Sequence, residues 1–281
     1  MLKKLFKHEL MFLLKWGALI WACILGLAIL CRVSTALFTA YMENTDVSNN
    51  DLLFSICLSS LATINTIFYL AAGISITFSI ILVAIRFYKN LFTQEGYFSF
   101  CIPITAKQHI WCKLLCGVLF IITSCLITFS SICIAISEFS GEITGDIFDS
   151  FISEINGAEI VHFVLYIIEG LTLIVTIISS SVLTFYCAIS FGQGFKNKIG
   201  GSIISYMIIN AILSAVQSFL VIFVMLISIL SVPDLGIDIS RVDPLWIIHV
   251  ILLIAIGIYV GLSTIFFKLT EKRITTKLNL N

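Results

Sequence analysis

Residues 52–85 read LLFSICLSSLATINTIFYLAAGISITFSIILVAI and contain no Asp, Glu, Lys or Arg. A helix that crosses a bilayer needs about 20 consecutive apolar residues, so this stretch is longer than one perpendicular crossing. Polar and apolar residues do not alternate along it, as they would in the wall of a membrane β-barrel. A helix satisfies its backbone hydrogen bonds within the segment, as lipid requires. The stretch therefore predicts a spanning helix that is tilted or extends beyond the membrane.

The composition of the whole chain also indicates that its surroundings are lipid rather than water. Its 281 residues are 59% hydrophobic and 11% charged, whereas soluble domains are about 45–50% apolar and about 25% charged. The net charge of zero gives no indication of nucleic-acid binding. Six apolar runs are long enough to span a bilayer: 16–38, 57–85, 114–137, 160–191, 202–231 and 245–267. We expect an all-α integral membrane protein with six transmembrane helices, in which residues 1–281 form one transmembrane domain.

The cationic residues predict the orientation of these spans. Fourteen of the sixteen Lys and Arg residues fall on one side: Lys3, Lys4, Lys7, Lys15, Arg86, Lys89, Lys107, Lys113, Lys196, Lys198, Lys268, Lys272, Arg273 and Lys277. Loops with an excess of Lys and Arg face the cytoplasm. We therefore expect a multi-pass protein of the cell (plasma) membrane with both termini cytoplasmic. Its acidic outer loops are then 43–51, 138–159 and 234–243.

The first fifteen residues have an amphipathic pattern. Apolar Leu2, Phe6, Leu10 and Leu13 fall on one helical face, and most of the basic residues fall on the other. Residues 1–15 are thus expected to form a helix in the cytoplasmic interface, attracted by anionic lipid. The alternative is a plain basic flank to the first span.

The chain shows no signature of a metal, cofactor or catalytic site. Its nine cysteines are scattered within or beside apolar runs without metal-ligand spacing, and we interpret them as small buried hydrophobic residues. There is no G-x-x-x-x-G-K-[ST] phosphate loop and no H-E-x-x-H. We therefore expect no enzyme activity and no ATP binding by this chain itself.

The loop of residues 86–107 is predicted to be cytoplasmic but is rich in aromatic residues. Tyr97, Phe98 and Phe100 follow Gly96, which permits a sharp turn. Thr105 and Gln108 form a T-x-x-Q capping box that predicts the start of the next helix. Exposed aromatic residues beside charges usually mark a partner surface. The alternative is that they fold back onto the bilayer interface or onto the helices of their own chain.

The stretch Phe87-Tyr-Lys-Asn-Leu-Phe-Thr-Gln-Glu-Gly-Tyr, followed by Ile102-Pro103, resembles the ABC-2 type family of ABC transporter permeases. Many members read F-Y-K-N-L-x-x-x-E-G-Y-L-x-x-x-L-P-V at this point, and the order of the spans also agrees. Phe98 and Ile102 replace the commoner leucines.

The resemblance implies the permease subunit of an ATP-driven exporter. Its partners would be a separate ABC ATPase and a second permease, in a homodimer or a heterodimer. In that family the loop after the second span docks into the ATPase. The corresponding coupling residues here would be Glu95, Gly96, Tyr97, Phe98 and Phe100.

The second cytoplasmic connection reads Gly192-Gln-Gly-Phe-Lys-Asn-Lys-Ile-Gly-Gly. Its glycines predict a tight turn, and its lysines follow the charge rule for cytoplasmic loops. We interpret it as a structural turn rather than as a second contact with an ATPase.

An ion- or proton-coupled secondary transporter is the main alternative, and a non-transporting membrane scaffold or sensor is another. Secondary transporters keep ionisable groups near the middle of the membrane. Glu169 is the acidic candidate within a span, and His162 precedes it by seven residues on the same helical face. Arg32 and His249 are placed nearer the outer ends of their helices. Glu169 either faces the bundle interior or lies on a helical extension beyond the membrane.

Overall fold

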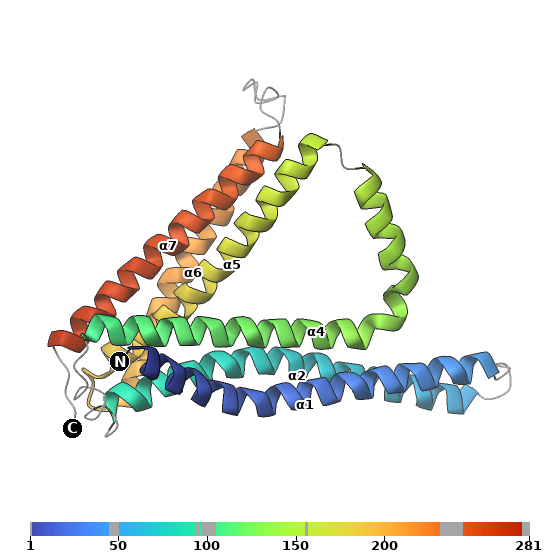
Figure 1. The fold of residues 1–281 in the computed structure, drawn as a ribbon, viewed down its shortest axis with the longest axis horizontal. Coiled ribbons are helices and arrows are strands. Elements are labelled where there is room, and N and C mark those ends of the chain that lie inside the picture. The colour runs from blue at the N-terminus through green and yellow to red at the C-terminus, as the bar shows by residue number, and fades with distance from the viewer. Residues whose placement is uncertain are drawn as a thin grey trace. The chain divides into compact units, whose positions relative to one another are not determined.

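The computed structural model describes residues 2–44, 51–93, 96, 105–154, 157–230 and 244–276. Six long helices account for nearly all of this described part of the chain, which contains no strand (Figure 1). They are α1 (Leu2–Asn44), α2 (Asp51–Phe92), α4 (Ala106–Glu154), α5 (Gly157–Gly192), α6 (Lys198–Leu230) and α7 (Pro244–Thr276). All six are long and apolar enough to cross a membrane. For the described residues, this confirms the prediction of an all-helical fold with six helices able to span a membrane.

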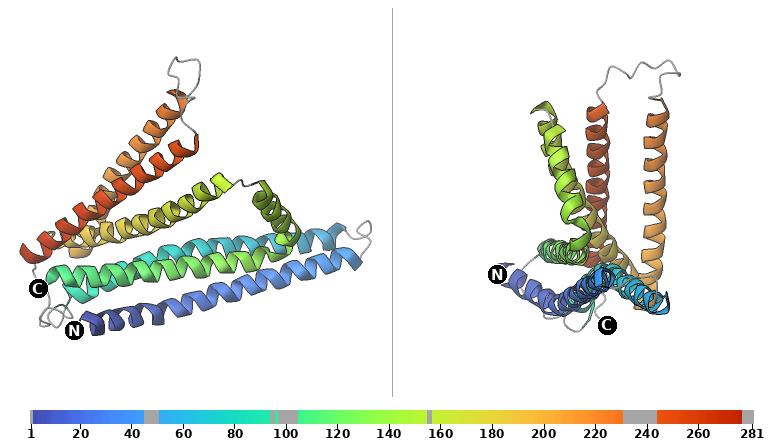
Figure 2. Two further views of the ribbon diagram at one scale, coloured as in Figure 1. Left: turned by 45° about the horizontal axis from the view of Figure 1, so that its top comes forward. Right: turned by 90° about the vertical axis from the view of Figure 1, so that its right-hand side faces the viewer.

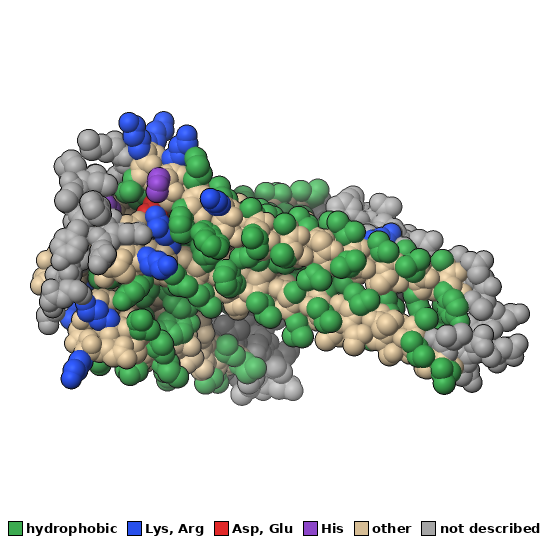
Figure 3. All heavy atoms as spheres, turned by 90° about the horizontal axis from the view of Figure 1, so that it is seen from below, with side chains coloured by type: hydrophobic (Ala, Val, Ile, Leu, Met, Phe, Trp, Pro, Cys, Tyr) green, Lys and Arg blue, Asp and Glu red, His purple; other side chains and the backbone are tan. Residues whose placement is uncertain are grey.

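The surface of the helices explains why the chain needs lipid as its solvent. Large apolar side chains point outward along every span; Leu70, Phe129 and Phe219, for example, are each more than three-fifths exposed. Figure 3 shows hydrophobic side chains spread widely over the described surface on the face drawn. Burial of such side chains in hydrocarbon removes the unfavourable contact with water that a soluble protein of this kind would have.

Several helices extend beyond the runs predicted from the sequence. Helix α4 continues to Glu154, so residues 138–154 are helical, where the sequence predicted an outer loop. The sequence carries a reason for this, because Phe139, Ile143, Ile147 and Phe151 recur at i, i+4 spacing. Similarly, α2 runs to Phe92 and includes the first part of the 86–107 loop.

Helix α1 is continuous from Leu2 to Asn44. Residues 2–15 are helical, as their amphipathic pattern predicted, and they continue without a break into the first span. Their position in the membrane interface stays a prediction. Of the other predicted outer loops, residues 45–50 of the first and residues 234–243 of the third lie outside the described part of the chain.

The helices group into two units, one of Lys3–Val83 with Leu119–Ile155 and the other of Ala84–Val118 with Asn156–Asn281. In the first unit α1, α2 and α4 run side by side (Figures 1 and 2). Its core contains Ile24, Ala28 and Cys31 from α1 against Phe68 from α2. The small residues Ala28 and Cys31 let the helices approach closely, as is typical of helix packing in membranes.

Hydroxyl groups tie the helices of this first unit together. The hydroxyls of Ser75 and Thr128 are 3.2 Å apart, and Ser79 donates to Ser124 at 3.1 Å. Trp21 of α1 donates its indole N–H to the same Ser124 oxygen at 3.1 Å. Because these groups are buried and have no water to bond with, interhelical hydrogen bonds of this kind hold the register of the three helices.

In the second unit α5 packs along both α6 and α7 (Figure 1). The connection from α5 to α6 is the tight turn that its glycines predicted. Asn197 caps α6, since its side-chain oxygen accepts a hydrogen bond from the Gly200 N–H at 3.2 Å. At Gly192 the backbones of the two helices nearly touch. A Cβ at this position would lie 2.4 Å from the backbone nitrogen of Ser202.

We expect Gly192→Ala to destabilise the protein by about 1–3 kcal/mol, because backbone atoms of Ser202 cannot move aside as a flexible side chain would. Thermal unfolding of the purified protein in detergent measures this. Gly194→Ala is the matched control, since its Cβ would meet only the Phe191 carbonyl oxygen at 3.4 Å. Equal melting temperatures for the two variants would contradict the close approach.

Candidate functional site

A cluster of ionisable and aromatic side chains lies where α5 and α7 begin. His162, Tyr166 and Glu169 share one face of α5, because their spacing of four and three residues matches the helical repeat. Trp246 and His249 lie three residues apart on α7. The packing of α5 along α7 brings these five side chains together, within the second unit.

His249 is the centre of the cluster. Its Nδ1 lies 2.8 Å from Oε2 of Glu169, and its Nε2 lies 3.0 Å from Nδ1 of His162. His249 is 3% exposed, and the Glu169 side chain is 14% exposed. The three residues therefore form a continuous hydrogen-bonded chain of ionisable groups, mostly removed from solvent.

Aromatic rings enclose this chain. The Tyr166 ring stacks on His249 with centroids 4.2 Å apart, and Trp246 meets His162 edge-on at 5.3 Å. Trp246 itself is about half exposed, as expected of a tryptophan at a membrane interface. The stacked rings fix the imidazole planes, so the direction of both His249 hydrogen bonds is set by packing.

The chain can hold a proton in two arrangements. With His249 neutral, Nδ1–H donates to the Glu169 carboxylate, and Nε2 accepts a hydrogen bond from Nδ1–H of His162. With His249 cationic, both of its nitrogens donate, and the pair with Glu169 becomes an ion pair. A proton on a cationic His162 can pass along this hydrogen bond from its Nδ1 to Nε2 of His249, which leaves His162 neutral with its remaining proton on Nε2. Within the described ranges, no group of three or more His, Cys, Asp or Glu side chains could hold a metal ion.

The second candidate site is the base of the 86–107 loop, where the resemblance motif begins. The motif residues Phe87, Asn90 and Leu91 are buried, whereas Lys89 between them is exposed. These three motif residues therefore have a packing role: they anchor the end of α2 in the second unit. Lys89 stays available at the surface, as a residue at the rim of a contact would be.

A stacked aromatic pair holds this end of α2. The rings of Phe87 and Tyr186 are 3.7 Å apart and nearly parallel, with an interplanar angle of 9°. The Tyr186 hydroxyl donates to the backbone carbonyl of Lys113 on α4 at 3.2 Å. Tyr186 of α5 thus connects the helix that enters the loop with the helix that leaves it.

The far end of the loop is fixed by the predicted capping box. The Gln108 N–H donates to the Thr105 hydroxyl at 3.3 Å, and the Thr105 N–H donates to the Gln108 side-chain oxygen at 3.1 Å. This reciprocal arrangement confirms the T-x-x-Q prediction and the start of α4 at Ala106.

The predicted coupling residues Glu95, Tyr97, Phe98 and Phe100 lie outside the described residues. Gly96 is described: it is buried, and its N–H donates to the Thr93 carbonyl at 2.8 Å. The structure brings the predicted Glu169 and His162 together through His249, which the sequence analysis had placed near an outer helix end without a partner. No sequence signal links residues 80 positions apart, so this pairing had to come from the packing of α5 on α7.

Comparisons of the chain with protein-family models, curated proteins and solved structures found no match.

Proposed function

We propose that this chain is the membrane-spanning permease subunit of an ATP-driven exporter, working with a separate ABC ATPase and a second permease. The observation that carries the proposal is the 86–107 stretch, with its F-Y-K-N-L start and E-G-Y centre. An aromatic loop between two membrane helices suits a docking element, since interface centres are enriched in aromatic residues.

The described ends of the loop support this role. A coupling element has to transmit movement, so its ends must be firmly joined to the helices that it moves. The Phe87–Tyr186 stack and the Thr105–Gln108 capping box provide such joints on either side of the loop. The direct test is affinity purification of the tagged chain from its native membrane. Recovery of a polypeptide with a G-x-x-x-x-G-K-[ST] loop supports the proposal, and its consistent absence contradicts it.

The proposal includes both termini in the cytoplasm of a plasma-membrane protein, on the strength of the cation distribution. In a cysteine-free background, we expect a membrane-impermeant maleimide applied outside the cell to label Ser150→Cys but not Gln94→Cys. Labelling of both positions from the same side would contradict this topology. Permeabilised cells, in which both should react, provide the control for accessibility.

A second candidate, a proton-coupled transporter, is favoured by the Glu169–His249–His162 chain, because chains of Asp, Glu and His serve as proton relays in membrane transporters. The depth of the chain weighs against it. At 1.5 Å per residue, Glu169 lies about 36 Å along α5 from Gln193, more than the roughly 30 Å of hydrocarbon. In the proposed topology the chain is thus at the outer membrane edge, whereas coupling sites lie near the midplane.

A further inference from the structure

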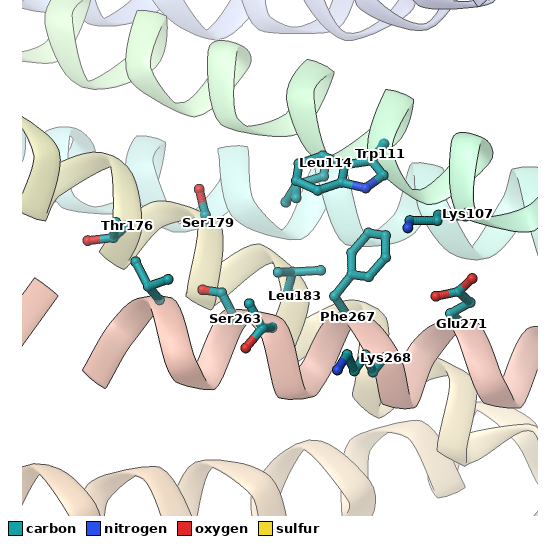
Figure 4. Close-up of a pocket in the computed structure, with 12 residues that line it drawn as sticks. Lys107, Trp111, Leu114, Thr176, Ser179, Leu183, Ser263, Phe267, Lys268 and Glu271 are labelled. Atoms are coloured by element: carbon teal, nitrogen blue, oxygen red, sulfur yellow. The ribbon is translucent and has the colours of Figure 1, made fainter. Parts of the chain in front are cut away.

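A groove of about 410 Å³ opens on the side of the second unit, between the start of α4 and the facing parts of α5 and α7. Its volume falls within the range of small-molecule pockets, about 300–1,000 Å³. Figure 4 shows Lys107 and Glu271 at one end of the groove and Thr176 toward the other, with Trp111 and Phe267 between them.

The wall of the groove suits hydrocarbon although it contains four hydroxyl groups. Each of these hydroxyls donates to a carbonyl of its own helix: Thr176 to Leu173, Ser179 to Val175, Ser263 to Tyr259 and Thr264 to Gly261. Because their protons are already bonded, they need neither water nor a polar ligand. Trp111 and Phe267 add an aromatic pair with ring centroids 5.2 Å apart.

One end of the groove carries an excess of positive charge. Lys107 and Lys268 line it together with a single carboxylate, Glu271. Both lysines are exposed, and within the described ranges no ion pair is recorded for either of them. An anionic group placed between them would be attracted by two charges and repelled by one.

The length of the groove matches one leaflet. From Glu271 to Val260 along α7 the rise is about 16 Å, half of the roughly 30 Å hydrocarbon core. Trp111, which is 47% exposed, lies near the charged end, where a tryptophan meets the headgroup region. Charge and length therefore fit an amphiphile whose headgroup is anionic and whose tail is apolar.

We propose that this groove binds an anionic phospholipid of the surrounding leaflet, with its headgroup between Lys107 and Lys268 and an acyl chain along Trp111 and Phe267. In the proposed topology this is the cytoplasmic leaflet, where juxtamembrane lysines meet anionic lipid. The inference rests on that topology but not on the ATPase partner. If no ATPase is recovered, the lipid site can still be tested, and if the lipid site is disproved, the proposed ATPase partner can still be tested.

The test uses the full-length protein in nanodiscs and the fluorescence of Trp111. Brominated phosphatidylglycerol or brominated phosphatidylcholine is titrated in, and quenching is measured in the unmodified protein and in Trp111→Phe. The difference between the two is the quenching of Trp111 by lipid in this groove. We expect phosphatidylglycerol to reach half-maximal quenching of this component at a roughly tenfold or more lower mole fraction. Each lysine should contribute about fivefold, which corresponds to about 1 kcal/mol.

Charge variants make the result specific to the groove. Lys107→Gln with Lys268→Gln should abolish the preference for phosphatidylglycerol, whereas Glu271→Gln should increase it. Lys196→Gln with Lys198→Gln, two lysines outside the groove, is the matched control and should leave the preference unchanged. Equal quenching by both lipids in the unmodified protein would overturn the proposal. An unchanged preference in the Lys107/Lys268 variant would also overturn it. The same holds if Trp111 is not quenched at all because a second copy of the chain covers the groove.

Discussion

Replacing Tyr97 and Phe98 together by alanine is expected to release the ATPase from this chain during purification, while the chain still inserts into the membrane. An aromatic anchor at the centre of an interface commonly contributes about 2 kcal/mol or more, or roughly 30-fold in affinity, when it is truncated. Two neighbouring anchors should therefore weaken association by more than either one alone. The measurement is retention of the ATPase by the tagged variant at matched expression and membrane levels.

Two controls separate docking from general damage. Phe195→Ala removes an exposed aromatic side chain from the other cytoplasmic connection, so it should leave ATPase retention unchanged. Glu95→Ala is a candidate rim change, which should affect affinity less than the aromatic pair does and is expected to uncouple hydrolysis from transport. Full retention of the ATPase by the double aromatic variant would remove this loop from the interface and, with it, most of the case for the exporter.

His249→Leu is expected to destabilise the protein by about 3–5 kcal/mol, because it leaves the Glu169 carboxylate buried without its partner. Glu169→Gln should cost only about 1 kcal/mol, since the amide oxygen can still accept the hydrogen bond from Nδ1–H of His249. The double change of both residues to Leu should restore much of the stability, because an apolar pair leaves no unpaired charge. Thermal unfolding in detergent measures the whole cycle.

His8→Leu serves as the matched control for this cycle, since His8 is exposed and its loss should change stability little. If the effects of His249→Leu and Glu169→Leu add up to that of the double Leu variant, His249 and Glu169 do not interact. The conservative Glu169→Gln variant also separates the two functional candidates. A proton-coupled transporter should lose transport when the carboxylate is neutralised, whereas an ATP-driven exporter should keep it. Glu169→Lys, in contrast, should damage insertion, because it would place a cation beside His249.

Residues 138–154 show how far reasoning from the sequence reaches. Their acidic side chains predicted an outer loop, whereas the structure continues α4 through them to Glu154. The apolar residues at i, i+4 spacing were visible in the sequence, so a periodicity count would have found this helix. The Glu169–His249 contact is a different case, because no count along the chain reveals it. That contact depends on which faces of α5 and α7 pack against each other.

The sequence by itself determined the six helices that are able to span a membrane and the start of α4 at its Thr105–Gln108 capping box. Both depend on residues within a few positions of one another and on hydrophobicity, so they can be read from consecutive residues. Only the tertiary structure decided that His249 meets Glu169, that Phe87 stacks on Tyr186, and that three helices enclose a groove. Between helices in lipid there is little hydrophobic driving force. Close packing and a few polar contacts therefore choose which faces meet, and residues far apart in the chain make those contacts.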